Sequence, residues 1–211
     1  MLNILVTDDH AVIRRGLRQI ITEGFGADAA IEEAQNAQEA LDHVWKREWD
    51  VVLLDITMPG RSGIDILKDI KLARPNTPVL FLTMHEEDQF AIRVLKAGAS
   101  GFINKESAPD ELVRAIRKAV SGGRYVSTAL AEKLALGLGS NSDKQPHEQL
   151  SDREFQVLCK IASGRTATQI AQDLGLSVKT VSTYRSRILE KMHKDNNAEL
   201  TSYAIKNRLV D

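Results

Sequence analysis

Carboxylate side chains follow two short apolar runs of this chain, at positions suited to phosphoryl chemistry. Asp55 comes directly after the run Val51–Leu54, and Asp8 and Asp9 come shortly after Ile4–Val6. Such runs are typical of strands buried on both faces, where a carboxylate is unfavourable unless it is paired. The carboxyl end of such a strand suits a carboxylate, because ligands of open α/β sheets bind there. The three side chains therefore predict an acidic pocket for Mg²⁺, in which one carboxylate can act as a nucleophile and form an acyl phosphate.

Two further polar side chains occupy matching positions. Thr83 follows the apolar run 79–82, and Lys105 follows the run 101–104. A hydroxyl can hydrogen-bond a phosphoryl group, and an ammonium can attract its oxygens. Any one of these residues alone is more often a helix cap, a turn residue or a solvated loop charge. Five of them at strand ends predict a site that binds a metal ion, accepts a phosphoryl group and responds to it.

The elements that must position these residues alternate in the first part of the chain. Apolar runs predict strands, and periodic stretches between them predict helices. This alternation predicts an α/β fold with a doubly wound, five-stranded parallel sheet. The expected strands are 3–7, 29–34, 50–55, 77–82 and 100–104, and the expected helices are 11–22, 37–47, 62–73, 86–97 and 108–121.

The second part of the chain shows no strand pattern. Ser151 and Glu154 form a capping box, and helices are expected at 152–163, 167–174, 178–192 and 197–207. Between the two parts, a possible helix at 127–136 precedes the Gly-, Ser- and Asn-rich stretch 137–146, which is typical of a flexible linker. We therefore expect a domain at 1–122, a linker at 123–149, and an all-α domain at 150–211.

The helix expected at 178–192 has two different faces. Val181, Ile188 and Met192 share one face, which we expect to point inward. The opposite face carries short polar side chains with basic residues at its edges, which suits a helix that enters the major groove of DNA. A plain solvated face is the alternative for such a helix taken alone. The outward residues are Lys179, Ser182, Thr183 and Ser186, flanked by Arg185, Arg187 and Lys191.

Composition excludes several other classes of protein. The chain has 211 residues, 43% of them hydrophobic, and we see no apolar run near the roughly 20 residues of a membrane span. A single cysteine, Cys159, excludes an internal disulfide and fits a reducing cytoplasm. Residues 147–211 hold 10 basic and 8 acidic side chains, against 18 and 21 in residues 1–146, so the helical part is the more basic one. We expect a cytoplasmic protein that does not enter membranes.

The first 125 residues closely resemble response-regulator receiver domains, through Asp8-Asp9, Asp55 in Leu-Leu-Asp-Ile-Thr-Met-Pro-Gly, Thr83, and Lys105 three residues after Phe102. The resemblance implies a flavodoxin-like fold. It implies Mg²⁺ held by Asp9, Asp55 and the main-chain carbonyl of Thr57, with Asp8 assisting through water. It also implies that Asp55 takes a phosphoryl group from a sensor histidine kinase, after which Thr83 and Lys105 turn toward it and the Phe102 ring moves with Thr83. Many relatives carry tyrosine at the position of Phe102, and a plain core role for this ring stays open.

The segment 150–200 resembles the LuxR-type helix-turn-helix of the NarL/FixJ class, through Leu150–Glu154, Ile161–Gly164, Ile170-Ala171, Leu176–Val181 and Ile188–Met192. The resemblance implies binding to double-stranded DNA and a dimer contact through the last helix. Tyr184 stands where many relatives have histidine, a change from which we expect little effect. The DNA-binding residues that the resemblance implies are Lys179, Thr180, Ser182, Thr183, Arg185, Ser186 and Arg187.

Together these patterns predict a phosphorylation-activated transcriptional regulator rather than an enzyme. Phosphorylation would shift a two-state receiver and release or dimerise the DNA-binding domain. A haloacid-dehalogenase-like phosphatase would need a second Asp two residues after Asp55, where Thr57 stands. A phosphate shuttle without transcriptional output is disfavoured by the fused helical domain. A dinucleotide-binding oxidoreductase is excluded because the first strand-to-helix turn lacks the glycine fingerprint.

Overall fold

The computed structural model describes residues 1–56, 58, 61–83, 88–105, 107–127, 130–132, 145–207 and 209–210. The chain divides into two units, Met1–Ala135 and Leu136–Asp211. Most of the expected linker lies outside the described residues. Within the expected helix at 127–136, residues 130–132 are helical, and Ser127 Oγ accepts a hydrogen bond from the Leu130 amide at 3.2 Å.

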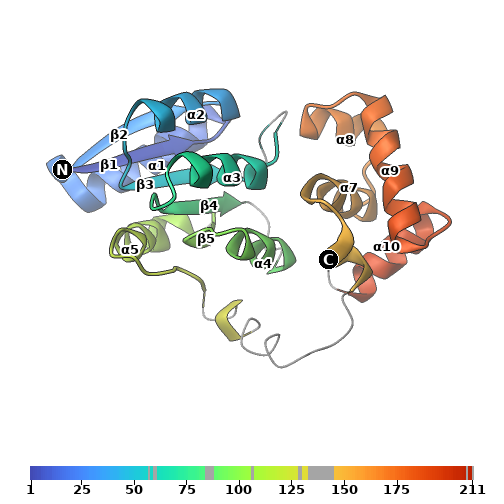
Figure 1. The fold of residues 1–211 in the computed structure, drawn as a ribbon. Helices are drawn as coiled ribbons and strands as arrows, with labels where there is room; N and C mark the ends of the chain where they lie inside the picture. Colours follow the sequence, from blue (N-terminus) through green and yellow to red (C-terminus); the bar gives the residue numbers. More distant parts are fainter. Residues whose placement is uncertain are drawn as a thin grey trace. The chain divides into compact units, whose positions relative to one another are not determined.

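The first unit is built on a parallel sheet, as the alternating pattern predicts. Its strand order is β2-β1-β3-β4-β5, so the chain winds first to one side of β1 and then to the other (Figure 1). This is the doubly wound arrangement, and its switch point lies between β1 and β3. The strands are β1 (Leu2–Thr7), β2 (Ala29–Ala34), β3 (Val51–Asp55), β4 (Val79–Thr83) and β5 (Gly101–Asn104).

Both faces of this sheet are covered. Ile4, Val6 and Leu53 belong to a buried cluster that includes residues of α1 (Ala11–Phe25) and α5 (Ala108–Val120). Leu5, Val52, Leu54 and Phe81 are equally buried and alternate with that set, so they point to the other face. The remaining helices of this unit are α2 (Ala37–Lys46), which packs beside α3 (Gly63–Ala73), and α4 (Asp88–Lys96), which contacts β5. Burial on both faces explains the unbroken apolar runs and leaves only the strand ends for polar chemistry.

The expected strand that begins at residue 77 starts two residues later. Pro78 precedes β4, and its carbonyl accepts a hydrogen bond from the Val52 amide at 2.9 Å. Thr83 is the last residue of β4 instead of the residue after it. The shift leaves Thr83 at the carboxyl end of the strand, as the sequence predicts.

The second unit is all-helical and contains the predicted helix-turn-helix. Its elements are η2 (Pro146–Gln149), α7 (Asp152–Ala162), α8 (Ala167–Leu174), α9 (Val178–Met192) and α10 (Asn197–Lys206). Ser151 and Glu154 form the predicted capping box of α7. Gly175, at φ 62°, is the C-cap of α8, and Ser177 is the N-cap of α9, so the turn between these helices has three residues, Gly175–Ser177. No helix within the described ranges combines the length and apolar character needed to cross a membrane.

Candidate functional site

The acidic residues meet at the carboxyl ends of β1 and β3. Thr7 pairs with Leu54 in the parallel register, so Asp8 and Asp55 follow at the same level of two neighbouring strands. Both are buried, at 0% and 2% exposure, whereas Asp9 is partly exposed. Asp8, Asp9, His10 and Asp55 each offer one ligand atom, and these atoms lie within 4.8 Å of one another. The predicted acidic pocket is therefore present at the sheet's switch point.

Lys105 spans this pocket from the end of β5. Its Nζ lies 2.6 Å from Asp8 Oδ2 and 3.0 Å from Asp55 Oδ2, and its side chain is only 6% exposed. The Lys105 amide donates to the carbonyl of Thr83 at 2.6 Å, so β4 and β5 end side by side. Thr83 is 3% exposed at that end. The structure thus places the Lys105 ammonium next to the carboxylates of Asp8 and Asp55. Thr83, the last residue of β4, lies beside Lys105 at the same edge of the sheet.

The charge of this pocket suits a divalent cation. Three carboxylates face one ammonium, so with all of them ionised the pocket carries a formal charge of about −2. Asp9 Oδ1 is buried and accepts no hydrogen bond from the described residues, although His10 Nδ1 lies 2.8 Å away. Clustered carboxylate oxygens are the ligands that Mg²⁺ prefers. The side chains present therefore fit such an ion.

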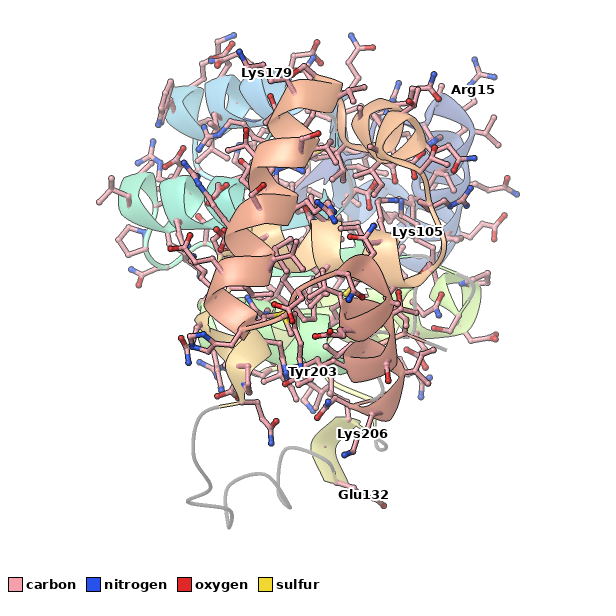
Figure 2. All side chains as sticks on the ribbon, turned by 90° about the vertical axis from the view of Figure 1, so that its right-hand side faces the viewer. Arg15, Lys105, Glu132, Lys179, Tyr203 and Lys206 are labelled. Carbon is pink, nitrogen blue, oxygen red and sulfur yellow. The ribbon has the colours of Figure 1, made fainter. Side chains whose placement is uncertain are left out.

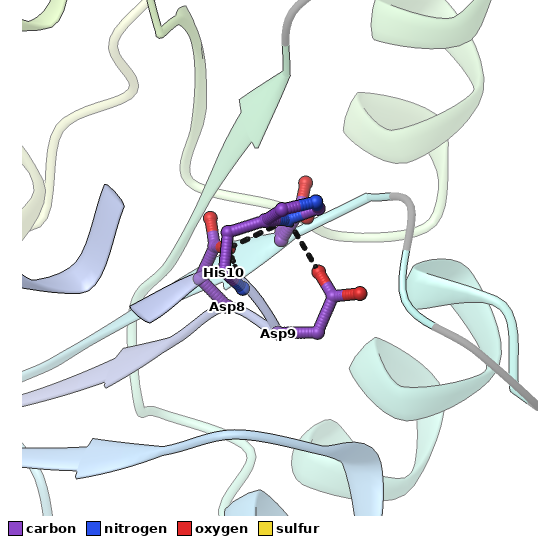
Figure 3. Close-up of side chains that lie close together, drawn as sticks. Asp8, Asp9 and His10 are labelled. Atoms are coloured by element: carbon purple, nitrogen blue, oxygen red, sulfur yellow. Dashed lines mark hydrogen bonds and ion pairs between the residues drawn. The ribbon is translucent and has the colours of Figure 1, made fainter. Parts of the chain in front are cut away.

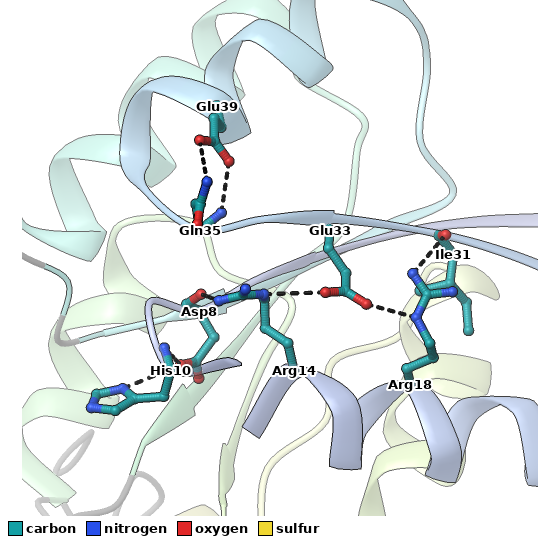
Figure 4. A network of polar contacts seen from close by, with 8 residues as sticks. All are labelled: Asp8, His10, Arg14, Arg18, Ile31, Glu33, Gln35 and Glu39. Atoms are coloured by element: carbon teal, nitrogen blue, oxygen red, sulfur yellow. Dashed lines mark hydrogen bonds and ion pairs between the residues drawn. The ribbon is translucent and has the colours of Figure 1, made fainter. Parts of the chain in front are cut away.

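An arginine network holds the loop that carries Asp8 (Figure 4). Arg14 Nη1 donates to the Asp8 carbonyl at 2.7 Å, while its Nε donates to Glu33 Oε2 at 3.2 Å. Arg18 Nε donates to the other Glu33 oxygen at 2.6 Å. The hydrogen bonds and charges of Arg18 and Arg14 hold the pKa of Glu33 below its ordinary value, although partial burial opposes them. This network fixes the β1–α1 loop to β2, a link that the sequence pattern does not predict.

The remaining predicted receiver residues are Phe102 and Thr57. Phe102 lies on β5 and packs, half-buried, against a cluster of Ala91, Leu95 and Leu130. The members of this cluster come from α4 and from the short helical segment that precedes the second unit. Thr57 lies outside the described residues, so the structure does not place its carbonyl.

The two faces of α9 are as predicted. Val181, Ile188 and Met192 are buried at 2% exposure or less. The opposite face is exposed, and Lys179 lies on its first turn (Figure 2). The hydroxyls of this face donate back along the helix, from Ser182 to the Val178 carbonyl at 3.0 Å, from Thr183 to Lys179 at 3.0 Å, and from Ser186 to Ser182 at 3.1 Å. Each hydroxyl oxygen keeps lone pairs that can accept a hydrogen bond from a partner.

Some polar residues of α9 also have structural contacts. The Thr180 amide donates to the N-cap oxygen of Ser177 at 3.1 Å. Arg185 Nε donates to Asn197 Oδ1 at 2.6 Å, which ties α9 to the start of α10. Thr180 and Arg185 are half-buried, whereas Ser182, Thr183, Ser186 and Arg187 are exposed. Within the predicted DNA-binding set, these four residues and Lys179 are therefore exposed to solvent, whereas Thr180 and Arg185 are not fully so.

Comparison with known families agrees with this architecture. Residues 4–117 match the family model described as "Response regulator receiver domain", and residues 148–204 match "Bacterial regulatory proteins, luxR family". Both are regulatory families rather than a named class of enzyme.

Full-length relatives have the same organisation. The chain is 35% identical to response regulator UvrY of Escherichia coli K12, over all of this chain and 97% of that protein. It is 34% identical to response regulator GacA of Pseudomonas aeruginosa, over all of this chain and 99% of that protein.

Among solved structures, RcsB of Salmonella enterica serovar Typhimurium, bound to the promoter rprA in the presence of the phosphomimetic BeF3−, has a TM-score of 0.64 at 26% identity. That match covers 96% of this chain and 98% of RcsB. A LuxR-family response regulator from Aurantimonas has a TM-score of 0.60 at 34% identity, covering 65% of this chain and 98% of that one.

Proposed function

The chain belongs to the NarL/FixJ response regulators, which join a receiver domain to a LuxR-type DNA-binding domain, and on this premise we propose that Asp55 is its phosphoryl acceptor. The observation that carries the proposal is the position of Asp55. It ends β3, buried, with Lys105 Nζ 3.0 Å from its Oδ2. A carboxylate oxygen there can attack the phosphorus of a phosphohistidine on a sensor kinase. The P–N bond breaks as the acyl phosphate forms, and the imidazole leaves with a proton.

Mg²⁺ is the metal that we assign to this reaction. Asp9, Asp55 and the main-chain carbonyl of Thr57 would hold it, and Asp8 would assist through a water molecule. When bound, the ion offsets the negative charge of the transferring group. Asp8 and Lys105 contribute from the protein side, because their pairing at 2.6 Å keeps the ammonium over the pocket.

Thr83 and Lys105 transmit the event in this proposal. Thr83 ends β4, the neighbour of β3, and Lys105 follows β5, the next strand along the sheet. Both can contact phosphoryl oxygens, but neither is the nucleophile. Phe102 would follow Thr83, and the cluster against which it packs includes Leu130, in the segment that leads to the second unit. A movement of this ring then changes the contacts of that segment.

The output is binding of double-stranded DNA through α9. Ser182, Thr183 and Ser186 would meet base edges, and Lys179, Arg185 and Arg187 would contact phosphates, with Thr180 at the start of the same surface. Phosphorylation or DNA binding would favour a homodimer, with α10 contributing a contact. We place this activity in the cytoplasm, where a sensor histidine kinase can supply the phosphoryl group, and we assign the chain no separate enzymatic role.

Incubation of the full chain with acetyl phosphate and Mg²⁺, followed by intact mass measurement, tests the assignment of Asp55. We expect one added phosphoryl group on the unmodified chain and none on Asp55→Asn. Asp50→Asn is the matched control, because Asp50 directly precedes Val51, the first residue of β3, whereas Asp55 is the last residue of that strand. Undiminished labelling of Asp55→Asn, or its loss in Asp50→Asn alone, would contradict the assignment.

A further inference from the structure

His10 places a ring nitrogen at the edge of the acidic pocket. Its Nδ1 lies 2.8 Å from Asp9 Oδ1 and 3.4 Å from Asp8 Oδ1, across the space between the two carboxylates (Figure 3). The His10 amide donates to Asp8 Oδ1 at 2.8 Å, so the main chain holds the residue against the acids. The side chain is 67% exposed, which leaves the rest of the ring in solvent. The nitrogen therefore faces the pocket on an otherwise open side.

These distances match the spacing of ligands around one ion. Two adjacent ligands of an octahedral ion, each about 2.1 Å from it, lie about 3.0 Å apart, and two opposite ligands lie about 4.2 Å apart. The two His10 distances bracket the first value, and the four ligand atoms of Asp8, Asp9, His10 and Asp55 all lie within 4.8 Å of one another. Within the described ranges this is the one group of three or more such side chains.

A nitrogen ligand changes which ion such a pocket prefers. Mg²⁺ is a hard cation that favours oxygen and keeps several water molecules, whereas imidazole suits later first-row ions such as Co²⁺ and Zn²⁺. A neutral imidazole also adds a ligand without changing the balance between the carboxylates, Lys105 and a divalent ion. Loss of the ring would cost Mg²⁺ little, since water can replace it.

We propose that His10 Nδ1 is a metal ligand of this receiver, and that it raises the affinity of the pocket for Co²⁺ and Zn²⁺ far more than its affinity for Mg²⁺. The inference rests on the proposed function, because it uses the same metal pocket. His10 adds an imidazole nitrogen to a group whose other side-chain ligands are all carboxylates. The alternative role for the ring is a direct contact of Nδ1 with Asp9 Oδ1 at the same 2.8 Å, which would compete with any metal.

The test compares metal affinities of the full chain. Co²⁺ is titrated by its visible absorption, and Mg²⁺ by calorimetry. The variants are His10→Phe, which keeps a ring without nitrogen, and His43→Phe as the matched control. His43 Nδ1 also pairs with a carboxylate, Glu32 Oε2 at 2.9 Å, but lies on α2. The His10 side chain makes no cap hydrogen bond at the start of α1, so its replacement spares the helix.

We expect His10→Phe to weaken Co²⁺ binding at least about tenfold and to shift its absorption, while Mg²⁺ affinity changes less than about twofold. His43→Phe should match the unmodified chain for both ions. Unchanged Co²⁺ affinity in His10→Phe, a gain in it, or an equal loss for both ions would each overturn the ligand assignment.

Asp55→Asn separates this failure from failure of the proposed function. If that variant binds both ions as the unmodified chain does, the metal is not in this pocket, and the proposed Mg²⁺ site falls with the inference. If Asp55→Asn weakens both ions while His10→Phe changes neither, the pocket holds the metal and only the role of His10 is wrong.

Discussion

Lys191, on the helix assigned to DNA, donates a hydrogen bond at 2.6 Å to Glu154, a carboxylate buried at the start of α7. The Glu154 side chain is 3% exposed, and the same oxygen accepts from the Ser151 amide at 2.8 Å. Burial alone would raise the pKa of Glu154, but the bonds from Lys191 and Ser151 together hold it below its ordinary value. The pair therefore joins the end of α9 to the start of α7.

Lys191→Met should lower the free energy of unfolding of the DNA-binding unit by about 1–3 kcal/mol at neutral pH. The change leaves a buried carboxylate without its cation, and partial exposure of Lys191 keeps the cost below that of a fully buried pair. Because the folded pKa of Glu154 is lowered, the contribution is present above the ordinary value of 4.5 and is lost as the pH falls through the folded pKa. The loss caused by Lys191→Met should therefore shrink in acid.

Denaturation followed by circular dichroism and by tryptophan fluorescence measures this effect. Both tryptophans, Trp45 and Trp49, lie in the first unit, so their signal should not change. Lys194→Met is the control, since none of the ion pairs found among the described residues includes Lys194. Equal stability of the Lys191 and Lys194 variants at neutral pH would refute the prediction.

Lys105→Met should destabilise the receiver by about 3 kcal/mol without metal. The change removes the ammonium from Asp8 and Asp55, which are buried, and leaves like charges unbalanced. Millimolar Mg²⁺ should recover part of the loss, because an ion that binds only the folded state stabilises it. Urea denaturation followed by tryptophan fluorescence, with and without Mg²⁺, measures both the loss of unfolding free energy and its recovery by the ion. Lys46→Met is the control, because Lys46 is exposed at the end of α2, and it should show neither effect. If Lys105→Met is as stable as the unmodified chain, the proposed charge balance is wrong.

Thr83→Ala should accept the phosphoryl group but lose much of its effect. We expect the gain in DNA affinity on phosphorylation to fall about tenfold, which equals about 1.4 kcal/mol. The reason is that Thr83 lies at the end of β4 beside the pocket and is assigned to sensing rather than attack. Thr77→Ala is the matched control, since Thr77 is also buried but lies just before the first residue of β4, at the opposite end from the pocket. Phosphorylated Thr83→Ala that binds DNA as tightly as the phosphorylated unmodified chain would place the switch elsewhere.

Local patterns in the sequence predicted the elements and the strand ends, because burial on both faces of a parallel sheet leaves a clear signal. Asp55 and Lys105 could be assigned to one site for this reason, although they are 50 positions apart. The hydrogen bond from Arg14 to Glu33 could not be predicted from the sequence, because it depends on how β1 and β2 are paired. Spacing of Arg14 and Arg18 at i and i+4 was the only available sign of it.

The polar face of α9 shows the same limit. Sequence reasoning grouped Arg185, Arg187 and Lys191 as flanking charges for DNA. In the structure Lys191 also contacts Glu154, and Arg185 also contacts Asn197, because α7 and α10 lie close to those turns. A helical pattern tells which residues point outward, but not which neighbouring helix they meet.

Thr183 and Arg187 separate reading of DNA sequence from binding of its backbone. Thr183 Oγ1 donates to the Lys179 carbonyl at 3.0 Å. In the proposed contact it would meet a base edge as an acceptor, which suits the amino groups of cytosine or adenine in the major groove. Thr183→Ala should cost about 1–3 kcal/mol on a duplex selected by the protein and little on a random duplex. Arg187→Ala should weaken binding to both duplexes alike and reduce the slope of log affinity against log salt by about one.

Titration of both duplexes at several salt concentrations makes this comparison. Ser163→Ala is the control for Thr183→Ala, because Ser163 Oγ donates to the Cys159 carbonyl at 3.0 Å in the same manner, but Ser163 is the C-cap of α7 and not part of α9. Removal of that hydroxyl should leave affinity for both duplexes unchanged, so any loss in Thr183→Ala reports a contact with DNA and not the helix bond. An equal loss on the selected and the random duplex would mean that Thr183 reads no base. If neither Thr183→Ala nor Arg187→Ala differs from the unmodified chain on any duplex, this face of α9 does not enter the groove.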